Sequence, residues 1–410
     1  MLLDSLLKKV IRHGRFAVID PGGRRHVYGD GSGGPTPTLR VHDRSVLFRA
    51  AIDPSLGFAE AYMDGRITVE EGDLYDVCMV VVENFERVGL SGLAKLKSVL
   101  RRLLRPLEQR NLAHIARRNV AHHYDLSGAL YDLFLDPDRQ YSCAYFARPD
   151  MTLEEAQAAK KAHIAAKLRL QPGMRVLDIG SGWGGLALTL ARDYGVDVTG
   201  VTLSTEQLGV ARGRAEKAGL ADRVKFELLD YRKVEGRFDR IVSVGMFEHV
   251  GVGFYDAYFG KIQHLLAPDG LAMVHTIGRA GPPGPTNSFI AKYIFPGGYT
   301  PALSEFMASV ERCGLVTTDV EVLRVHYAET LKEWRRRFRA RWADAAALYD
   351  ERFCRMWDLY LASCEASFRV GGQVVFQVQM GHTVASAPMT RDYLYNAGPE
   401  AALGHRSAAQ

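Results

Sequence analysis

The feature that most constrains this chain is a short apolar strand that runs into a glycine-rich turn near the middle of the sequence. It reads Val176-Leu177-Asp178-Ile179-Gly180-Ser181-Gly182-Trp183-Gly184-Gly185. Glycine permits positive φ angles and lacks the Cβ that would keep a ligand away from the backbone. A helix that follows such a turn directs free backbone N–H groups at the ligand. The turn therefore predicts a nucleotide-like ligand, with a purely structural turn as the alternative.

Strand and helix patterns alternate from about residue 150 onward. Candidate strands span residues 175–179, 196–201, 224–228, 238–244 and 270–277, with two more at 320–326 and 373–380. Candidate helices span residues 186–193, 206–218 and 255–266. This alternation is typical of an α/β fold, in which helices cover both faces of a parallel sheet.

The first hundred residues have a different pattern and no recognisable chemical motif. Short strands are expected at residues 15–19, 25–29 and 38–41, and short helices at 55–63 and 73–85. A chain of 410 residues suits one large domain and an accessory one. We therefore expect a small mixed α+β N-terminal domain over residues 1–110 and the ligand-binding domain over residues 111–410.

The composition excludes several classes of protein. The longest apolar run, residues 77–82, is far shorter than the roughly 20 residues that span a bilayer. Asp4, Lys8 and Lys9 interrupt any apolar segment of a signal peptide, so we expect a cytoplasmic protein. The five cysteines are odd in number and widely spaced, which argues against a disulfide framework and a zinc cluster. No metal site is predicted.

The net charge of +5 is unevenly distributed. One basic stretch holds Arg101, Arg102, Arg105, Arg110, Arg117 and Arg118, and another holds Lys332, Arg335, Arg336, Arg337, Arg339 and Arg341. Such runs are typical of solvated helix faces. The alternative is a surface for anionic lipid headgroups or nucleic acid.

The position of the acidic residue decides between the possible ligands. A dinucleotide site needs a carboxylate at the end of the second strand, about 20 residues after the glycines. Here that strand ends at Thr202, and the acid is Asp178, two residues before Gly180. This arrangement resembles class I S-adenosylmethionine methyltransferases, where the carboxylate can anchor the region of the ligand's cationic amino group. We therefore predict S-adenosylmethionine rather than a dinucleotide.

Five segments together resemble the cyclopropane-fatty-acyl-phospholipid synthase family, over roughly residues 115–385. They are His123-Tyr124-Asp125 with Gln140-Tyr141-Ser142-Cys143-Ala144-Tyr145-Phe146; the glycine turn with Trp183; Thr202-Leu203-Ser204-Thr205-Glu206-Gln207; Gly245-Met246-Phe247-Glu248-His249-Val250-Gly251; and His275-Thr276-Ile277-Gly278 with Tyr293-Ile294-Phe295-Pro296-Gly297-Gly298. The resemblance implies a Rossmann-like seven-stranded class I methyltransferase domain. It also implies an N-terminal domain for lipid engagement and dimerisation.

The resemblance also implies roles for individual residues. The expected cofactor contacts are Tyr141, Ser142, Asp178, Gly180, Gly182, Trp183, Gly184, Thr202, Ser204, Gln207, Asp230 and Tyr231. The family holds a bicarbonate ion beside the reacting carbon, and its ligands map onto Cys143, Glu248, His275, Ile277 and Tyr327. Cys364 matches a cysteine once regarded as catalytic, although the reaction needs no thiolate, so we interpret it as structural and close to the site.

The implied reaction converts a cis double bond of a phospholipid acyl chain into a cyclopropane ring. Methyl transfer to an alkene leaves a carbocation, and ring closure needs a base in a site dry enough to exclude water. A methyl-branched unsaturated product is the closest alternative, because it differs only in which proton leaves. A nucleic-acid methyltransferase has little support, since no base-binding Asn-Pro-Pro-Tyr or catalytic Pro-Cys motif is present.

The expected partner is therefore a phospholipid surface with anionic headgroups at the inner face of the membrane, and not nucleic acid. A homodimer is also expected.

Overall fold

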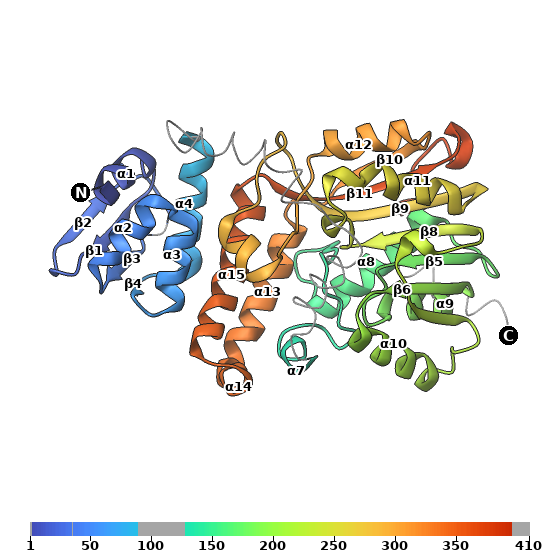
Figure 1. Cartoon of the computed structure of the whole chain (residues 1–410), viewed down its shortest axis with the longest axis horizontal. Coiled ribbons are helices and arrows are strands. Elements are labelled where there is room, and N and C mark those ends of the chain that lie inside the picture. The colour runs from blue at the N-terminus through green and yellow to red at the C-terminus, as the bar shows by residue number, and fades with distance from the viewer. Residues whose placement is uncertain (1, 35, 89–127, 396–410) are drawn as a thin grey trace. The chain divides into compact units, whose positions relative to one another are not determined.

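The glycine turn follows β5, an interior strand of a seven-stranded sheet (Figure 1). The computed structural model describes residues 2–34, 36–88 and 128–395, and within them the sheet has the order β10-β11-β9-β8-β5-β6-β7. Neighbouring strands from β9 to β7 are parallel, whereas β10 and β11 are antiparallel to each other. The strands are β5 (Arg175–Ile179), β6 (Asp197–Thr202), β7 (Val224–Leu228), β8 (Phe238–Val244), β9 (Leu266–Arg279), β10 (Val316–Val322) and β11 (Gln373–Gly381).

Helices cover both faces of this sheet, as the alternation predicted. Val176 of β5 packs with α8 (Leu153–Leu168), α9 (Gly185–Tyr194) and α10 (Thr205–Lys217). The next residue, Leu177, packs on the other face with α11 (Tyr255–Leu265) and α12 (Leu303–Arg312). Successive side chains of a strand point to opposite faces. Asp178 therefore shares the face of Val176, toward α8 and α9.

The chain order places a topological switch beside the glycine turn. The chain runs from β5 outward to β6 and β7, and then returns to β8 on the other side of β5. Ligands of open α/β sheets bind at the carboxyl ends of strands at such a switch. The carboxyl ends of β5 and β8 are thus the expected position of the site.

Two predicted strands were wrong in their boundaries, and the one expected at residues 270–277 is the longer β9 (Leu266–Arg279). The strand expected at residues 320–326 is β10 and ends at Val322, and His326 already begins α13 (His326–Ala340). The ladder with β11 stops where Val322 pairs with Phe376. The His326 ring stacks on Tyr145, with ring centroids 4.8 Å apart. This contact, far away in the sequence, holds His326 outside the strand.

A second compact unit holds the described N-terminal residues. Its sheet has the order β2-β1-β3-β4, and α15 packs along α4 and α3. The elements are α1 (Leu2–Val10), β1 (Phe16–Ile19), β2 (Arg25–Tyr28), β3 (Thr38–Val41), α2 (Arg44–Ile52), α3 (Pro54–Met63), β4 (Ile67–Glu71), α4 (Leu74–Val88), α14 (Trp342–Leu348) and α15 (Glu351–Val370). The predicted strands are confirmed, while β4 and α2 were missed.

The division between the two units differs from the expected single boundary at residue 110. The N-terminal unit also takes residues 284–296 and 327–373, and the remaining described residues form the unit with the large sheet. The reason lies in long-range contacts, because Arg355 Nε of α15 donates to the Met63 carbonyl oxygen at 2.8 Å. Arg352 Nε of the same helix lies 2.9 Å from Asp64 Oδ1.

The basic stretch in α13 is largely paired within its own unit. Arg335 is buried, and its Nε donates to Asp358 Oδ1 at 2.7 Å. Its Nη1 donates to Asp73 Oδ1 at 2.6 Å, and Arg339 also pairs with Asp73. Arg336 pairs with Glu333. This stretch is therefore an ion-pair network more than a free basic surface.

Two stretches that the sequence analysis singled out cannot be compared with the structure. The basic stretch from Arg101 to Arg118 and the segment His123-Tyr124-Asp125 lie outside the described residues.

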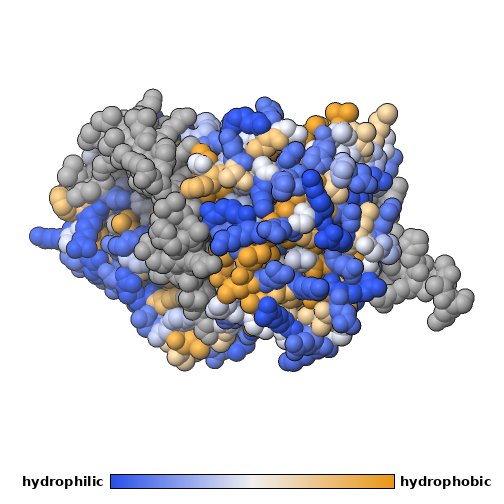
Figure 2. Space-filling view, turned by 45° about the vertical axis from the view of Figure 1, so that its right-hand side comes forward, coloured by the Kyte–Doolittle hydropathy of each residue, from blue (hydrophilic) through white to orange (hydrophobic). Residues whose placement is uncertain are grey.

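Among the described residues, no helix has the length and apolarity needed to cross a membrane. Hydrophilic residues cover most of the face in Figure 2, with a group of hydrophobic ones near its centre.

Candidate functional site

The backbone of the glycine turn can be formed only at some cost by other residues. Gly180, Gly182 and Gly184 have φ angles of 85°, 54° and 82°, a region that L-residues seldom adopt. A Cβ on Gly184 would lie 2.6 Å from Phe226 Cζ, so this glycine is needed for packing. A Cβ on Gly182 would meet no atom within 4 Å. The turn therefore leaves open space above Gly182, where a ligand can approach the backbone.

Asp178 and Ser181 place buried polar atoms beside this turn. Asp178 is 2 % exposed, and its Oδ2 accepts no hydrogen bond from the described residues. Burial raises the pKa of Asp178 to about 7, and the nearby Lys160 charge lowers it in part. Ser181 Oγ is likewise buried without a partner in the described part of the chain. Buried polar atoms of this kind are usually satisfied by a ligand or water.

The predicted contacts after β6 form a local hydrogen-bonded cap. Ser204 is the N-cap of α10, and its Oγ accepts from the Gln207 backbone N at 3.2 Å. Thr202 Oγ1 donates to Gln207 Oε1 at 3.1 Å. These three residues are thus brought together at the carboxyl end of β6. Their types are explained by the cap as well as by a cofactor contact.

The predicted contacts after β7 and near the turn are also held in place. Asp230 caps the short helix Tyr231–Lys233, and its carboxylate accepts from Arg232 Nε at 2.8 Å. Trp183 Nε1 donates to Glu206 Oε2 at 3.0 Å. The rings of Trp183 and Tyr141 both pack on Tyr131, at centroid distances of 4.9 and 5.3 Å.

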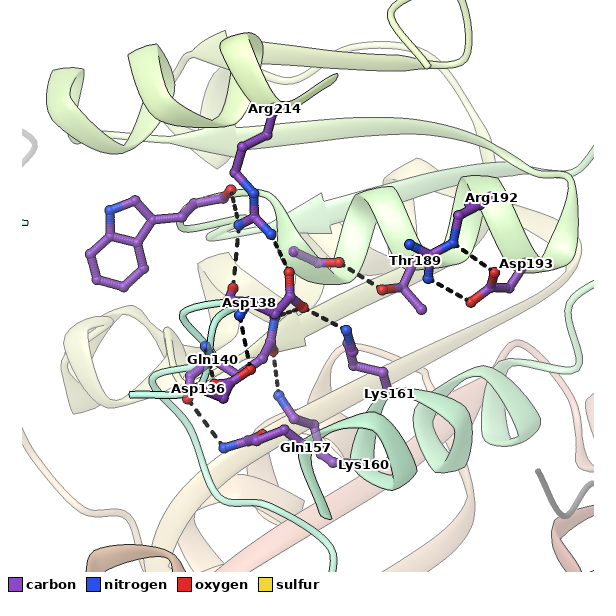
Figure 3. Close-up of polar contacts among 12 residues, drawn as sticks. Asp136, Asp138, Gln140, Gln157, Lys160, Lys161, Thr189, Arg192, Asp193 and Arg214 are labelled. Atoms are coloured by element: carbon purple, nitrogen blue, oxygen red, sulfur yellow. Dashed lines mark hydrogen bonds and ion pairs between the residues drawn. The ribbon is translucent and has the colours of Figure 1, made fainter. Parts of the chain in front are cut away.

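Two residues of α8 that sequence reasoning missed, Gln157 and Lys160, hold the segment from Gln140 to Ser142, and Figure 3 shows them beside Gln140. Lys160 Nζ donates to Gln140 Oε1 at 2.5 Å and to Ser142 Oγ at 2.9 Å. Gln157 Nε2 donates to the carbonyl oxygens of Gln140 and Ser142 at 3.2 and 3.0 Å. The signal was present in the sequence, because Gln157 and Lys160 share a helical face with Ile164 and Leu168. Polar residues at such core-facing positions call for a specific partner.

Asp138 links the same segment to the glycine turn, as Figure 3 shows. Its carboxylate accepts from Lys161 and pairs with Arg214 of α10. Arg214 Nη1 also donates to the Trp183 carbonyl oxygen at 2.9 Å. A Cβ on Gly185 would lie 2.6 Å from Asp138 Oδ2, so the two segments are in close contact.

Glu248 lies just after β8 and touches the end of β9. Its Oε1 accepts from the Ile277 backbone N at 2.6 Å, and its Oε2 is buried without a partner among the described residues. Burial raises the pKa of Glu248 to about 7. The same loop reaches the glycine turn, because a Cβ on Gly180 would lie 2.9 Å from Met246 Cβ. A carboxylate with this pKa can exchange a proton near neutral pH.

His275 of β9 is buried and neutral. Burial lowers its pKa well below the ordinary value, and the nearby Lys160 charge lowers it further. Gln377 Nε2 lies 3.1 Å from His275 Nδ1. With the amide as donor, the imidazole proton is on Nε2, which makes His275 a neutral hydrogen-bond donor. Cys143, which is also buried, donates its Sγ–H to the carbonyl oxygen of Ala144 at 3.3 Å.

Two predicted residues belong to the N-terminal unit. Tyr327 lies in the first turn of α13 and packs on Phe368, with ring centroids 4.7 Å apart. Cys364 lies in α15, and burial raises the pKa of its thiol to about 12. A thiol with this pKa is protonated at neutral pH, which agrees with the interpretation of Cys364 as a structural cysteine.

The residues present fit S-adenosylmethionine. The open space above Gly182 admits a backbone contact, and Asp178, four residues earlier, has a buried carboxyl oxygen without a partner among the described residues. Asp178 lies in the first strand before the glycines, and the second strand ends without a carboxylate at Thr202. This combination suits a methyl donor rather than a dinucleotide.

Comparison with known proteins shows which family this chain belongs to. The sequence model of the family described as "Mycolic acid cyclopropane synthetase" matches residues 112–378. A "Probable fatty acid methyltransferase" of Pseudomonas putida is 44% identical over 379 residues, which cover 88% of this chain and 93% of that protein. The "Cyclopropane-fatty-acyl-phospholipid synthase" of Escherichia coli K12 is 40% identical over 356 residues, which cover 85% and 88%. The crystal structure of mycolic acid cyclopropane synthase CmaA1 with SAH and CTAB is 38% identical, with a TM-score of 0.62, and covers 64% of this chain and 97% of its own.

Proposed function

Because this chain belongs to the cyclopropane synthetase family of S-adenosylmethionine-dependent enzymes that transfer a methyl or methylene group, we propose that it is a cyclopropane-fatty-acyl-phospholipid synthase. Its substrate would be the cis double bond of a phospholipid acyl chain. The similarity to the Escherichia coli enzyme along nearly the whole chain supports this substrate class.

The methyl donor supplies an electrophilic sulfonium methyl group when it is bound. The residues proposed to hold it are the glycine turn, Asp178, the Tyr141–Ser142 pair and the strand ends at Thr202 and Asp230. The role of these residues is to align the donor with the alkene, because an isolated alkene is a weak nucleophile and orientation can supply much of the rate. Buried surroundings also keep water away from the cation that forms on the alkene.

The proposed base site lies around Glu248 and His275. A bicarbonate ion bound there would accept the proton that leaves the added methyl group. The neutral His275 would donate a hydrogen bond from Nε2, and Glu248 with its raised pKa would hold or return a proton. The Ile277 N–H already donates a hydrogen bond to Glu248 Oε1. Cys143 is proposed as a further ligand from its place in the family motifs.

The single observation that carries the proposal is that the carboxyl of Glu248 and the imidazole of His275 are both buried near the ends of β8 and β9. Glu248 and His275 are only 8 % and 2 % exposed, and the loop before Glu248 contacts the glycine turn through Met246. Methyl transfer to an alkene leaves a cation that must lose a proton before water captures it, so a base in a dry place suits this reaction.

A second candidate keeps the cofactor and the first step but loses a different proton. The product would be a methyl-branched unsaturated chain. The 44% identity to a probable fatty acid methyltransferase favours this alternative. Both products add one CH2, so mass alone cannot separate them.

The experiment is an incubation of purified protein with S-adenosylmethionine and vesicles of a defined cis-unsaturated phospholipid. NMR of the extracted lipid distinguishes cyclopropane protons from vinyl protons beside a new methyl branch. A cyclopropane ring supports the proposal, whereas a methyl-branched alkene supports the second candidate.

We also propose that the protein works at an anionic membrane surface as a homodimer in the cytoplasm. The support is chemical, because phospholipid substrates reside in the bilayer and a peripheral enzyme must meet them there. Co-sedimentation with anionic and neutral vesicles tests the first part. Sedimentation equilibrium tests the second.

A further inference from the structure

We propose that Lys160 is a positioning residue of the methyl-donor site, which holds the Tyr141–Cys143 segment through the Ser142 hydroxyl. The inference rests on the proposed function only in assigning Tyr141 and Ser142 as donor contacts. It adds a residue from α8, a helix outside the sequence motifs, to the machinery of the site.

The burial of Lys160 is the first argument. Its side chain is 0 % exposed, on the face of α8 that packs against the sheet. Lysine is almost never fully buried without a partner, because desolvation of the ammonium is costly. Burial indeed lowers the pKa of Lys160 to about 8. Leucine or methionine would serve packing alone better at this position.

The nature of its partners is the second argument. Both acceptors, Gln140 Oε1 and Ser142 Oγ, are neutral groups; Ser142 is a predicted donor contact, and Gln140 directly precedes the predicted contact Tyr141. Lys167 offers a direct contrast, because it lies two helical turns later and is equally buried. Its Nζ lies 2.6 Å from the carboxylate of Glu321, which compensates its charge. Lys160 instead hydrogen-bonds neutral groups of the segment that it holds, while the carboxylates of Asp136 and Asp138 act on it only through their charge.

The completeness of the support is the third argument. Gln157, one turn earlier on α8, donates to the backbone carbonyls of Gln140 and Ser142. The segment is therefore held by α8 through both its backbone and its side chains. Cys143 follows Ser142 directly, so a shift of this segment would move the predicted contacts of both the donor and the base.

The fourth argument is the effect of the Lys160 charge on the pKa values of two site residues. Its charge lowers the pKa of Asp178 and that of His275. It therefore lies near the carboxyl proposed for the donor's amino group and near the imidazole of the proposed base site. One buried cation links the two halves of the site.

The test measures the affinity for S-adenosylhomocysteine by calorimetry in Lys160→Met, Ser142→Ala and the double variant. Lys160→Met should weaken binding at least tenfold. If Lys160 acts through Ser142, the two changes are not additive, so Ser142→Ala should weaken binding less than threefold further in the Lys160→Met background. A purely structural lysine would give effects that multiply.

Lys167→Met is the matched control, because it removes an equally buried lysine from the same helix. Its affinity for S-adenosylhomocysteine should stay within threefold of the wild type. If Lys160→Met also stays within threefold, or if its effect multiplies with that of Ser142→Ala, the inference is wrong. If Lys160→Met does not fold, Lys160→Gln replaces it. If neither folds, Ser142→Ala decides alone, and an unchanged affinity overturns the inference.

These measurements separate this inference from the proposed function. None of them uses a lipid substrate. A wild-type protein that makes no cyclopropane lipid refutes the proposed function and leaves the role of Lys160 in donor binding intact.

Discussion

Gly182→Ala should abolish tight donor binding while it leaves the fold largely intact. The φ angle of 54° costs an alanine about 1–2 kcal/mol. Because a Cβ at this position meets no atom within 4 Å, no clash adds to that cost. The new methyl group would project into the space where we place the donor. We expect the affinity for S-adenosylhomocysteine to fall at least tenfold, or about 1.4 kcal/mol.

Two other glycines make this prediction specific. Gly173 has a φ of 82° and open space around its Cβ position, but it lies before β5, at the opposite end of the strand. Gly173→Ala should therefore lose similar stability and keep full affinity. Gly184→Ala should lose more stability, about 2–5 kcal/mol, because the Cβ clash with Phe226 adds about 1–3 kcal/mol to the backbone cost.

Urea unfolding measures the stability of each variant, and calorimetry measures its affinity for S-adenosylhomocysteine. If Gly182→Ala binds as tightly as Gly173→Ala at equal stability, the donor does not lie over Gly182. The assignment of the glycine turn as the donor site would then be refuted.

Three further predictions concern buried charges. Glu248→Gln should lower turnover at least a hundredfold, because it removes a proton carrier. Its affinity for S-adenosylhomocysteine should stay within threefold of the wild type, because glutamine keeps the shape of the side chain. Equal losses of turnover and affinity would contradict this role. Affinity for S-adenosylhomocysteine should rise about tenfold between pH 6 and pH 8, because the pKa of Asp178 is about 7 and the ligand's amino group favours the ionised carboxylate. Asp178→Asn should remove this dependence of affinity on pH. An unchanged dependence in the variant would exclude Asp178 as the titrating group. Arg335→Ala should destabilise the protein by about 3–5 kcal/mol in urea unfolding, because it leaves the buried Asp358 without its partner. The double variant Arg335→Met with Asp358→Leu should recover most of that lost stability. A double variant as unstable as Arg335→Ala would contradict the ion-pair explanation.

Glu248 also predicts a dependence of stability on pH. Its folded pKa of about 7 lies above the ordinary value of 4.5. The folded state therefore binds the proton more tightly, and its contribution to stability is lost as the pH rises from about 4.5 through 7. Glu248→Gln should gain stability relative to the wild type over that range, as measured by urea unfolding at pH 5 and pH 8.

The parts of the fold that could be predicted are those that depend on short-range patterns in the sequence. β5, β7 and β8 begin and end where the apolar runs predicted, because each is a short buried strand between turn residues. The motif order also identified the family correctly, which the comparisons confirm. These features depend on neighbours in the sequence.

The parts that could not be predicted depend on contacts between distant segments. The end of β10 follows from the stacking of His326 on Tyr145, 181 residues away. The membership of α15 in the N-terminal unit follows from its packing on α3 and α4. Neither contact leaves a periodic signal. The expected boundary at residue 110 therefore missed the later segments of that unit.

The site shows the same division. The glycine turn, Glu248 and His275 could be chosen as candidates because their residue types occur at strand ends in a recognisable order, and their roles stay predictions. Lys160 could not, because its role depends on which segment lies opposite α8. A buried lysine at a core-facing position was the only local sign.

The most direct test of the account follows the transferred carbon itself. Purified protein is incubated with S-adenosylmethionine carrying a ¹³C methyl group and with vesicles of a cis-unsaturated phospholipid, and the lipid is analysed by ¹³C NMR. The account predicts that the label appears in the CH2 of a cyclopropane ring and that the vinyl signals disappear in proportion. A label in a methyl branch beside a retained double bond, or no labelled lipid, would contradict it.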